Sequence, residues 1–274
     1  MQYVEETRWI VRLRRINLLM ENHLQFEVKS IDGTIESRSV NVRKLCLGRH
    51  CGRDMEMTRK ALDAKRAEGF LVHGNPNVCR KGRYLLTNEN AIEVQGPQTS
   101  GEVEVVAIMD GGEVLISVGS DHVDRTIEIM WTDALGKVYD SAKSKQMAPA
   151  VVARDAWRYE DVKNHWDQLS LKTYIVVDGR KIAYQDFSVG ILVDLEYHFK
   201  ALPWLREDGV ILFCGSSRTL PSVPPDVYQV YQRPSPSLKF PSMFELELHD
   251  PILQRVISHS YEVLSIEEPG SISL

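Results

Sequence analysis

The chain has 274 residues, of which 43% are hydrophobic and 26% are charged, and its formal net charge is -5. This composition is that of a globular protein and excludes extensive disorder, which requires low hydrophobicity and high charge. The acidic balance argues against nucleic-acid binding, because that function needs a basic surface. The apolar runs are strand-sized and the N-terminal region carries charges where a signal peptide has its apolar core. We therefore expect a cytoplasmic protein that binds neither nucleic acid nor membranes.

The first part of the chain is predicted to be rich in strands. Residues 1–40 contain short apolar stretches around an Asp32-Gly33 turn, which is typical of a β-hairpin. Helix-forming residues with an apolar stripe predict a helix over residues 53–68. A loop-rich connector follows, with one expected strand at residues 84–87.

From Gly101 onward the pattern predicts mainly strands. One further helix is expected over residues 188–202, where apolar residues recur at helical spacing. Six prolines between residues 219 and 241 predict a long irregular loop, of a kind that is usually functional or mobile. The expected strands of this region are 102–109, 113–119, 125–131, 172–177, 181–185, 210–214, 243–248 and 255–264.

These elements predict a β-rich α+β chain. We expect residues 1–98 to form an N-terminal β-rich segment with one helix, packed on a core of residues 99–266. Residues 267–274 are expected to be a loose tail. The four cysteines have no paired or zinc-like spacing, so we interpret them as buried small hydrophobic residues.

The segment 100–125 carries the strongest functional signal. Two apolar strands flank an Asp-Gly-Gly turn at residues 110–112, which is a hairpin signature. Because side chains alternate along a strand, Glu102 and Glu104 lie on one face, and the hairpin places Asp121 beside Glu102. Three carboxylates in one place repel one another unless a cation binds, and Mg²⁺ prefers such oxygen ligands.

The same spacing also fits a solvated strand face on which Glu102 and Glu104 alternate with valines. The adjacent residues 120–125 (SDHVDR) hold four polar functional side chains, which a plain surface turn rarely needs. The spacing alone leaves the metal site and the solvated face both open.

Six segments follow one another in a distinctive order: residues 47–54 (LGRHCGRD), 101–108 (GEVEVVAI), 120–125 (SDHVDR), 142–149 (AKSKQMAP), 177–185 (VDGRKIAYQ) and 208–217 (DGVILFCGSS). This order resembles that of the fumarylacetoacetate hydrolase superfamily and covers about residues 45–264. The pattern is most similar to an uncharacterised side branch whose members share a G-S-D-H-x-D-R signature.

The resemblance implies a mixed β-roll with few helices, built around a Mg²⁺ or Mn²⁺ site and usually found in a homodimer. It assigns the metal ligands to Glu102, Glu104 and Asp121. The implied substrates are small β-diketo or oxo acids, and the metal would polarise a substrate carbonyl as a Lewis acid.

The resemblance also implies residues that would contact the substrate. A lysine, either Lys143 or Lys145, would stabilise negative charge on the developing enolate, and Lys145 is favoured because it adjoins Gln146. Arg125 would stabilise the same charge. Gln146 is itself a candidate for substrate binding.

The substrate carboxylate would accept hydrogen bonds from Gln185 and from Ser216 or Ser217. The chain departs from the family at Asp54, which stands where hydrolytic members place the histidine that activates water. Asp54 and His122 are therefore the candidates for this role, with His50 as another nearby histidine.

Three functions remain open. The first is a metal-dependent hydrolase that cleaves a carbon–carbon or related acyl bond of an oxo acid. The second is a lyase or isomerase at the same site, such as a decarboxylase, dehydratase or tautomerase, which the missing histidine favours. The third is a non-catalytic protein that binds a small molecule.

Overall fold

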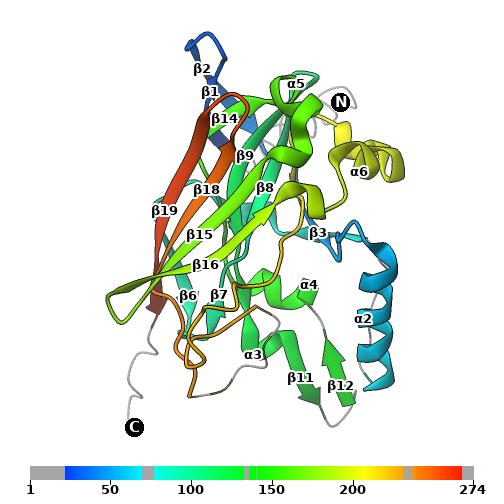
Figure 1. Cartoon of the computed structure of the whole chain (residues 1–274), viewed down its shortest axis with the longest axis vertical. Coiled ribbons are helices and arrows are strands. Elements are labelled where there is room, and N and C mark those ends of the chain that lie inside the picture. Colours follow the sequence, from blue (N-terminus) through cyan, green and yellow to red (C-terminus); the bar gives the residue numbers. More distant parts are fainter. Residues whose placement is uncertain are drawn as a thin grey trace, which may run out of the picture.

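Most of the chain folds into two β-sheets (Figure 1). The computed structural model describes residues 22–69, 77–132, 136–139, 141–230, 232, 235 and 237–266. Within this part, the larger sheet has ten strands: β1 (His23–Lys29), β2 (Ile35–Asn41), β3 (Lys44–Arg49), β4 (Asn77–Lys81), β5 (Leu86–Thr87), β8 (Val103–Asp110), β9 (Glu113–Asp121), β13 (Ala150–Val152), β14 (Asp155–Arg158) and β17 (Val210–Phe213). The smaller sheet has five: β6 (Ala91–Gln95), β15 (Ser170–Val177), β16 (Arg180–Ser188), β18 (Met243–Asp250) and β19 (Arg255–Ile266).

The larger sheet curls back on itself to form a roll. Its strands run in the order β2-β1-β14-β9-β8-β17-β3-β4. From β4 the chain passes through a short 3-10 helix, η1 (Arg83–Leu85), into β5, which pairs with β13, and β13 pairs with β9. The sheet therefore encloses an interior, into which the inner faces of β3, β8, β9 and β17 point.

The hairpin of β8 and β9 forms at the expected turn. Gly111 and Gly112 both have positive φ, 59° and 78°, as a two-residue type I′ turn requires. Val103 pairs with Ser120, and the backbone N–H of Asp121 donates to the Glu102 carbonyl at 3.3 Å. Asp121 therefore lies beside Glu102, as the spacing predicts.

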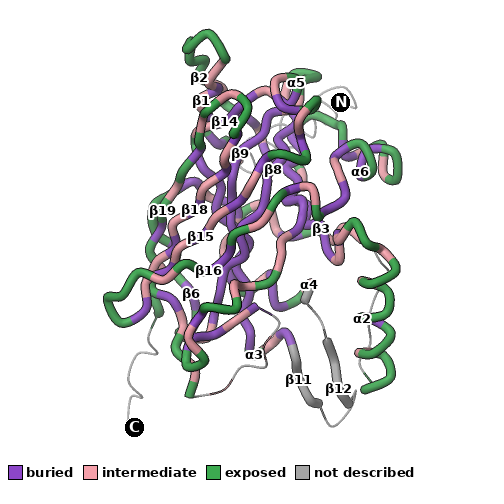
Figure 2. The backbone as a smooth tube through the Cα atoms, viewed as in Figure 1, coloured by how far each residue is buried: buried purple, intermediate pink, exposed green. Residues whose placement is uncertain are grey.

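Alternation along β8 separates two hydrophobic cores. The strands at the centre of the molecule are mostly buried (Figure 2). Val103 and Val105 pack toward the smaller sheet, and Val106 and Ile108 pack inside the roll. Because Glu104 alternates with Val103 and Val105, its side chain lies on the inner face of the roll.

The remaining elements are small. Two further strand pairs are β7 (Thr99–Ser100) with β10 (Val123–Asp124), and β11 (Ile129–Thr132) with β12 (Gly136–Tyr139). The helices are α2 (Met55–Ala67), α3 (Arg125–Glu128), α4 (Ser141–Ser144), α5 (Tyr159–Val162), α6 (Leu195–Ala201) and the 3-10 turns η2 (Lys145–Met147), η3 (Lys163–Gln168), η4 (Val189–Ile191) and η5 (Pro203–Arg206). None of the helices in the described part of the chain has the length and apolar character that crossing a membrane requires.

The β-rich α+β prediction is confirmed, and helix α2 matches the expected helix at residues 53–68. Strands on both sides of the expected boundary after residue 98 share the ten-stranded sheet, while the expected tail at 267–274 lies outside the described residues. Of the four cysteines, all free, three are buried and Cys79 is half-buried.

Three element predictions are wrong in part. The strand expected at residues 84–87 begins in the 3-10 helix η1, and only β5, at its end, is a strand. The expected strand at 125–131 begins as helix α3, because the Asp124 carboxylate accepts hydrogen bonds from the backbone N–H groups of Thr126 and Ile127 and so starts a helical turn. The single helix expected at 188–202 is two elements, η4 and α6. The Ser188 side chain caps η4 and the Asp194 side chain caps α6. Because Asp194 begins a new helix, the apolar pattern of residues 188–202 does not form one continuous helix.

Candidate functional site

The candidate site lies at the open end of the β8–β9 hairpin, inside the roll. Glu102, Glu104 and Asp121 meet there, and their residues are only 8%, 2% and 0% exposed. The interpretation of Glu102 and Glu104 as a solvated strand face is therefore wrong. The roll encloses this end of the hairpin, which no pattern of alternation within β8 could reveal.

Asp121 is held between two lysines from different parts of the chain. The Lys81 ammonium, at the end of β4, donates to Asp121 Oδ1 at 2.9 Å, and the Lys145 ammonium, from η2, donates to Oδ2. Burial alone would raise the pKa of Asp121, but the charges of Lys145 and Lys81 hold it below its usual value. Asp121 is therefore a carboxylate at neutral pH.

The two lysines differ in how readily they lose a proton. Burial lowers the pKa of Lys81 despite its contact with Asp121, and both side chains are fully enclosed. Burial also opposes the charge on Lys145, but Asp121, Glu102 and Glu104 together raise its pKa. Lys145 stays protonated and faces the carboxylates, whereas Lys143 is exposed.

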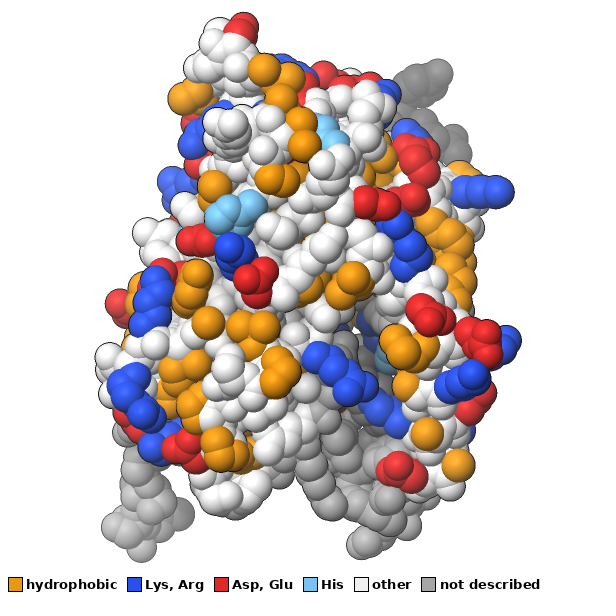
Figure 3. All heavy atoms as spheres, in the orientation of Figure 1, with side chains coloured by type: hydrophobic (Ala, Val, Ile, Leu, Met, Phe, Trp, Pro, Cys, Tyr) orange, Lys and Arg blue, Asp and Glu red, His pale blue; other side chains and the backbone are white. Residues whose placement is uncertain are grey.

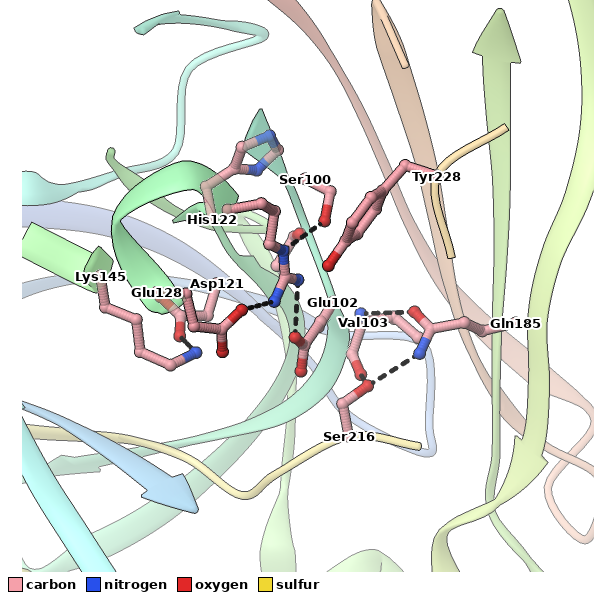
Figure 4. A network of polar contacts seen from close by, with 12 residues as sticks. Ser100, Glu102, Val103, Asp121, His122, Glu128, Lys145, Gln185, Ser216 and Tyr228 are labelled. Atoms are coloured by element: carbon pink, nitrogen blue, oxygen red, sulfur yellow. Dashed lines mark hydrogen bonds and ion pairs between the residues drawn. The ribbon is translucent and has the colours of Figure 1, made fainter. Parts of the chain in front are cut away.

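Arg125 organises the other side of the cluster. Its guanidinium is fully buried and donates to Glu102 at 2.7 Å, to Glu128 at 2.9 Å and to the Ser100 hydroxyl at 2.8 Å (Figure 4). Tyr228 belongs to the proline-rich loop of residues 219–241. The centroid of its ring lies 5.4 Å from the guanidinium carbon of Arg125. The irregular loop that the prolines predict therefore packs its tyrosine against the site.

Glu104 is the carboxylate without a cationic partner. Its Oε2 accepts a hydrogen bond from the backbone N–H of Gly215 at 2.5 Å, and it forms no ion pair with any described residue. Burial, and then the charges of Asp121 and Glu102, raise the pKa of Glu104 well above its usual value. An added positive charge would allow Glu104 to ionise.

A network of hydrogen bonds links Gln185, Ser216 and Ser217 to the start of β8. The Gln185 side chain accepts a hydrogen bond from the Val103 N–H at 3.1 Å. It donates to the Ser216 hydroxyl at 3.0 Å and to the Ser217 carbonyl at 2.6 Å. The Ser216 hydroxyl in turn donates to the Val103 carbonyl at 2.7 Å (Figure 4). The amide of Gln185 and the hydroxyl of Ser216 are therefore already engaged. They hold the start of β8, which carries Glu104.

His122 lies on the opposite side of β9 from Asp121. Its ring packs edge-on against Phe244 and Tyr261, with Nδ1 3.0 Å from the Tyr261 hydroxyl. Burial, and then the charges of Lys81 and Arg125, lower the pKa of His122 to about 3. The structure therefore places a neutral, enclosed histidine between the sheets and not among the carboxylates.

Asp54 and Gln146 have local partners. Asp54 is exposed and caps helix α2 by accepting from the Met57 N–H at 2.9 Å. Gln146 accepts from the Gly82 N–H at 2.8 Å and donates to the Arg80 carbonyl at 3.0 Å. Gln146 therefore joins the segments that carry the two lysines, and Asp54 is not brought to the carboxylate cluster.

The cluster fits a hard divalent cation in donor type and in charge, since its oxygens are carboxylates and one of them, Glu104, has no cation of its own. Among the described residues, however, no three His, Cys, Asp or Glu side chains converge as a metal site in this conformation. Lys81 and Lys145 engage both oxygens of Asp121, and Arg125 engages Glu102. A bound metal would share these carboxylates with the cations that now contact them.

Sequence reasoning missed Lys81, Glu128 and Tyr228. Lys81 ends a short strand in a basic run, where nothing in the sequence distinguishes a buried lysine from a solvated one. Glu128 follows Arg125 by three residues, which is a helical spacing, and was hidden by the predicted strand. Tyr228 is the one aromatic residue between Pro221 and Val230, and a buried residue in a proline-rich loop is a usable signal.

The chain belongs to a family described as "Protein of unknown function (DUF2848)", whose model matches residues 72–261. No curated protein matches the sequence at a significant level.

Solved structures share the fold. Cg1458 with an inhibitor is 12% identical, with a TM-score of 0.54 over 89% of this chain and 90% of that chain. A 2-keto-3-deoxyarabinonate dehydratase is 15% identical, with a TM-score of 0.54 over 85% of this chain and 78% of that chain. The apo form of 2-keto-3-deoxy-D-arabinonate dehydratase is 14% identical, with a TM-score of 0.52 over 85% and 77%. These folds are of the fumarylacetoacetate hydrolase type, so the predicted mixed β-roll is confirmed.

Proposed function

We propose that this protein is a metal-dependent lyase that acts on a small 2-oxo acid through an enolate. The observation that carries the proposal is the buried carboxylate cluster, in which Glu104 lacks a cation while Asp121 is kept ionised by Lys145. A dehydratase of a 2-keto-3-deoxy sugar acid is among the proteins of the same fold, which supports the reaction class.

Glu102, Glu104 and Asp121 would hold Mg²⁺ or Mn²⁺. When bound, such a cation polarises the substrate carbonyl and stabilises the negative charge that develops on its oxygen. Lys145 supplies a permanent positive charge at the same place, because its neighbours raise its pKa. Arg125 fixes the orientation of Glu102, and Gln185 fixes the strand from which Glu104 projects.

The position of Asp54, at the start of helix α2, favours a lyase over a hydrolase. Hydrolysis needs a group that activates water, and the residue at the corresponding position is an exposed carboxylate that caps a helix. Elimination from an enolate needs no water as a nucleophile. Hydrolysis is therefore the alternative reaction, and the experiment must distinguish it from elimination.

The segment GSDHVDR, residues 119–125, supplies both Asp121 and Arg125. We propose that it marks the side branch of the superfamily to which the chain is similar. A homodimer is the expected state, as the resemblance implies, and the strand-sized apolar runs and the charged N-terminal region lead us to expect a cytoplasmic location.

The first experiment measures Mn²⁺ binding by titration calorimetry, and exchange of the C3 protons of 2-oxo acids in deuterated water by NMR. The wild-type protein should bind Mn²⁺ and catalyse the exchange, because an enolate takes up solvent deuterium. Glu104→Gln should lower the Mn²⁺ affinity at least about tenfold and stop the exchange, since a neutral amide replaces a carboxylate ligand. The metal-free variant should be no less stable than the wild type, because it no longer buries an unpaired carboxyl group.

The matched control is Glu245→Gln. Glu245 belongs to a second E-x-E pattern, on β18, and pairs with Lys181 at the surface. This control should retain metal binding and exchange. Equal exchange by wild type and Glu104→Gln would refute the proposal, and product formed in ¹⁸O-labelled water with label in a new carboxyl group would establish hydrolysis in place of elimination.

A further inference from the structure

The last residue of β3, Arg49, carries a buried guanidinium with unused hydrogen-bond donors. Arg49 is 6% exposed, and neither its Nε nor its Nη2 has a hydrogen-bond partner among the described residues. The guanidinium also interacts with the thiol of Cys79, which is a weak partner. A buried donor left unpaired is costly, so two on one side chain point to an acceptor that the described part of the chain does not supply.

The two unpaired nitrogens define the shape of that acceptor. The N–H groups of Nε and Nη2 project in parallel from the same edge of the guanidinium. This fork matches the two oxygens of a carboxylate in a bidentate contact. A carboxylate is therefore the group that satisfies both donors at once.

Arg49 points into the roll toward the same end as the carboxylate cluster. Alternation along β3 puts it on the inner face with Leu45 and Leu47, which pack in the core of the roll. Phe213 of β17 pairs with both Leu47 of β3 and Val106 of β8. Continuing that register by two residues brings Arg49 and Glu104 to either side of Gly215.

Gly215 donates its backbone N–H to Glu104, and Cys51 packs against the face of Gly215 that would carry a side chain, 2.9 Å from the place of a Cβ. Neighbouring strands lie about 4.8 Å apart, so the backbones at Arg49 and Glu104 are about 10 Å apart. A small molecule held at the Glu104 carboxylate can therefore reach the Arg49 guanidinium.

Basic side chains outnumber carboxylates around Arg49, where the charges of Lys65 and Lys145 act together with that of Glu128. His50 follows it with a left-handed backbone, φ 55°, and the buried Nε2 of His50 has no described partner. Burial, and then the charges of Arg49, Lys65 and Lys145, lower the pKa of His50 to about 4. The charges of Lys145, which pairs with Asp121, and of Lys65 thus act on the same place as Arg49, and an anion bound beside Arg49 would be stabilised by them.

Helix α2 carries Lys65, whose charge acts on His50. Of its residues only Leu62 is buried, so few apolar contacts hold the helix in place. Figure 3 shows a recess between the body of the molecule and the part that carries α2, with Lys or Arg side chains and a histidine at its opening. Displacement of α2 would admit a ligand to the enclosed nitrogens.

The geometry points to a carboxylate-binding site at Arg49, with His50 and Lys65 beside it, that takes the second carboxylate of a dicarboxylic 2-oxo acid. This inference rests on the proposed function for the reacting end of the molecule. Arg49 is then a specificity-determining residue, because it distinguishes substrates by a group remote from the reacting carbonyl.

The test compares two probes of equal chain length, 2-oxoglutarate and 2-oxopentanoate, which differ in the terminal carboxylate. Their binding to the full-length protein is measured by titration calorimetry. The wild type should bind 2-oxoglutarate between about tenfold and a hundredfold more tightly, as a charge-assisted bidentate contact implies. Arg49→Met should abolish this preference, and Arg49→Lys, which keeps the charge without the fork, should reduce it.

The control is Arg154→Met, which removes a surface guanidinium that is 57% exposed and should leave the preference unchanged. A preference that survives in Arg49→Met, or is missing in the wild type, overturns the inference. Arg49→Lys keeps the test decisive if the methionine variant does not fold. Inorganic phosphate that displaces 2-oxoglutarate at equal or lower concentration overturns the assignment to a carboxylate.

The outcome is separable from that of the proposed function. A wild type that prefers the dicarboxylate through Arg49 but exchanges no protons refutes the enolate chemistry and keeps this site. If the protein catalyses proton exchange but binding does not depend on Arg49, the enolate chemistry is supported and the carboxylate site at Arg49 is refuted.

Discussion

Replacing Lys81 by methionine tests how the carboxylate cluster is held together. Methionine keeps most of the apolar stem and removes the ammonium that donates to Asp121 Oδ1 at 2.9 Å. Both side chains of this ion pair are fully enclosed. Asp121 is left in the interior with Lys145 as its remaining cationic partner.

The expected loss follows from the burial of the pair. Removing one partner of a buried ion pair costs about 3–5 kcal/mol, because the other charge stays in a medium of low polarity. Since Lys145 still compensates Asp121, we expect about 3 kcal/mol. For a chain of this length that loss lowers the Tm by about 5 °C.

The assay is equilibrium unfolding in urea for Lys81→Met, Asp121→Asn and the double variant. The two changes should be far from additive, because both break the same Lys81–Asp121 pair, and the double variant leaves Lys145 without its carboxylate just as Asp121→Asn alone does. As a control, Lys163→Met breaks an exposed pair with Glu160 and should cost less than about 0.5 kcal/mol. A cost below about 1 kcal/mol for Lys81→Met, or additive effects, would show that water or a rearranged Lys145 already satisfies Asp121.

Two further predictions concern single residues. His50 has a folded pKa near 4 against about 6.5 when unfolded, so the unfolded state binds more protons between these values and stability falls as the pH drops from 6.5 to 4. The wild type should lose about 2 kcal/mol more than His50→Gln over this range, after allowance for the partial exposure of the ring; parallel pH–stability curves would contradict this. Gln185→Met should cost about 2–3 kcal/mol in thermal unfolding and weaken Mn²⁺ binding, because it leaves the Val103 N–H and the Ser217 carbonyl unpaired; unchanged unfolding would mean that water replaces the amide.

The β8–β9 hairpin could be predicted from local sequence patterns alone. The turn, the register and the meeting of Glu102 with Asp121 all follow from two strands joined by two glycines, because a short turn leaves one way to align the strands. The strand expected at 125–131 failed for an equally local reason. A capping carboxylate at Asp124 outweighed the apolar run that follows it.

Burial of the cluster could not be predicted in the same way. A glutamate on a strand faces water or protein according to what the rest of the sheet does, and here the roll closes through β5 and β13. The choice between a solvated face and a functional cluster therefore depended on strands far away in the chain.

The sequence alone determined the fold class, the central hairpin and the order of the segments that carry the carboxylates and Lys145, since these depend on periodicity and turn chemistry over short distances. The tertiary structure decided which charges face one another. Lys81 reaches Asp121 across 40 residues, and β17 lies between the strands that carry Arg49 and Glu104. Such contacts depend on strand order and closure of the sheet, which local residue preferences do not encode. The net charge of -5 thus conceals an interior in which Glu102, Asp121 and Glu128 pair with Arg125, Lys81 and Lys145, while neither Glu104 nor Arg49 forms an ion pair with a described residue.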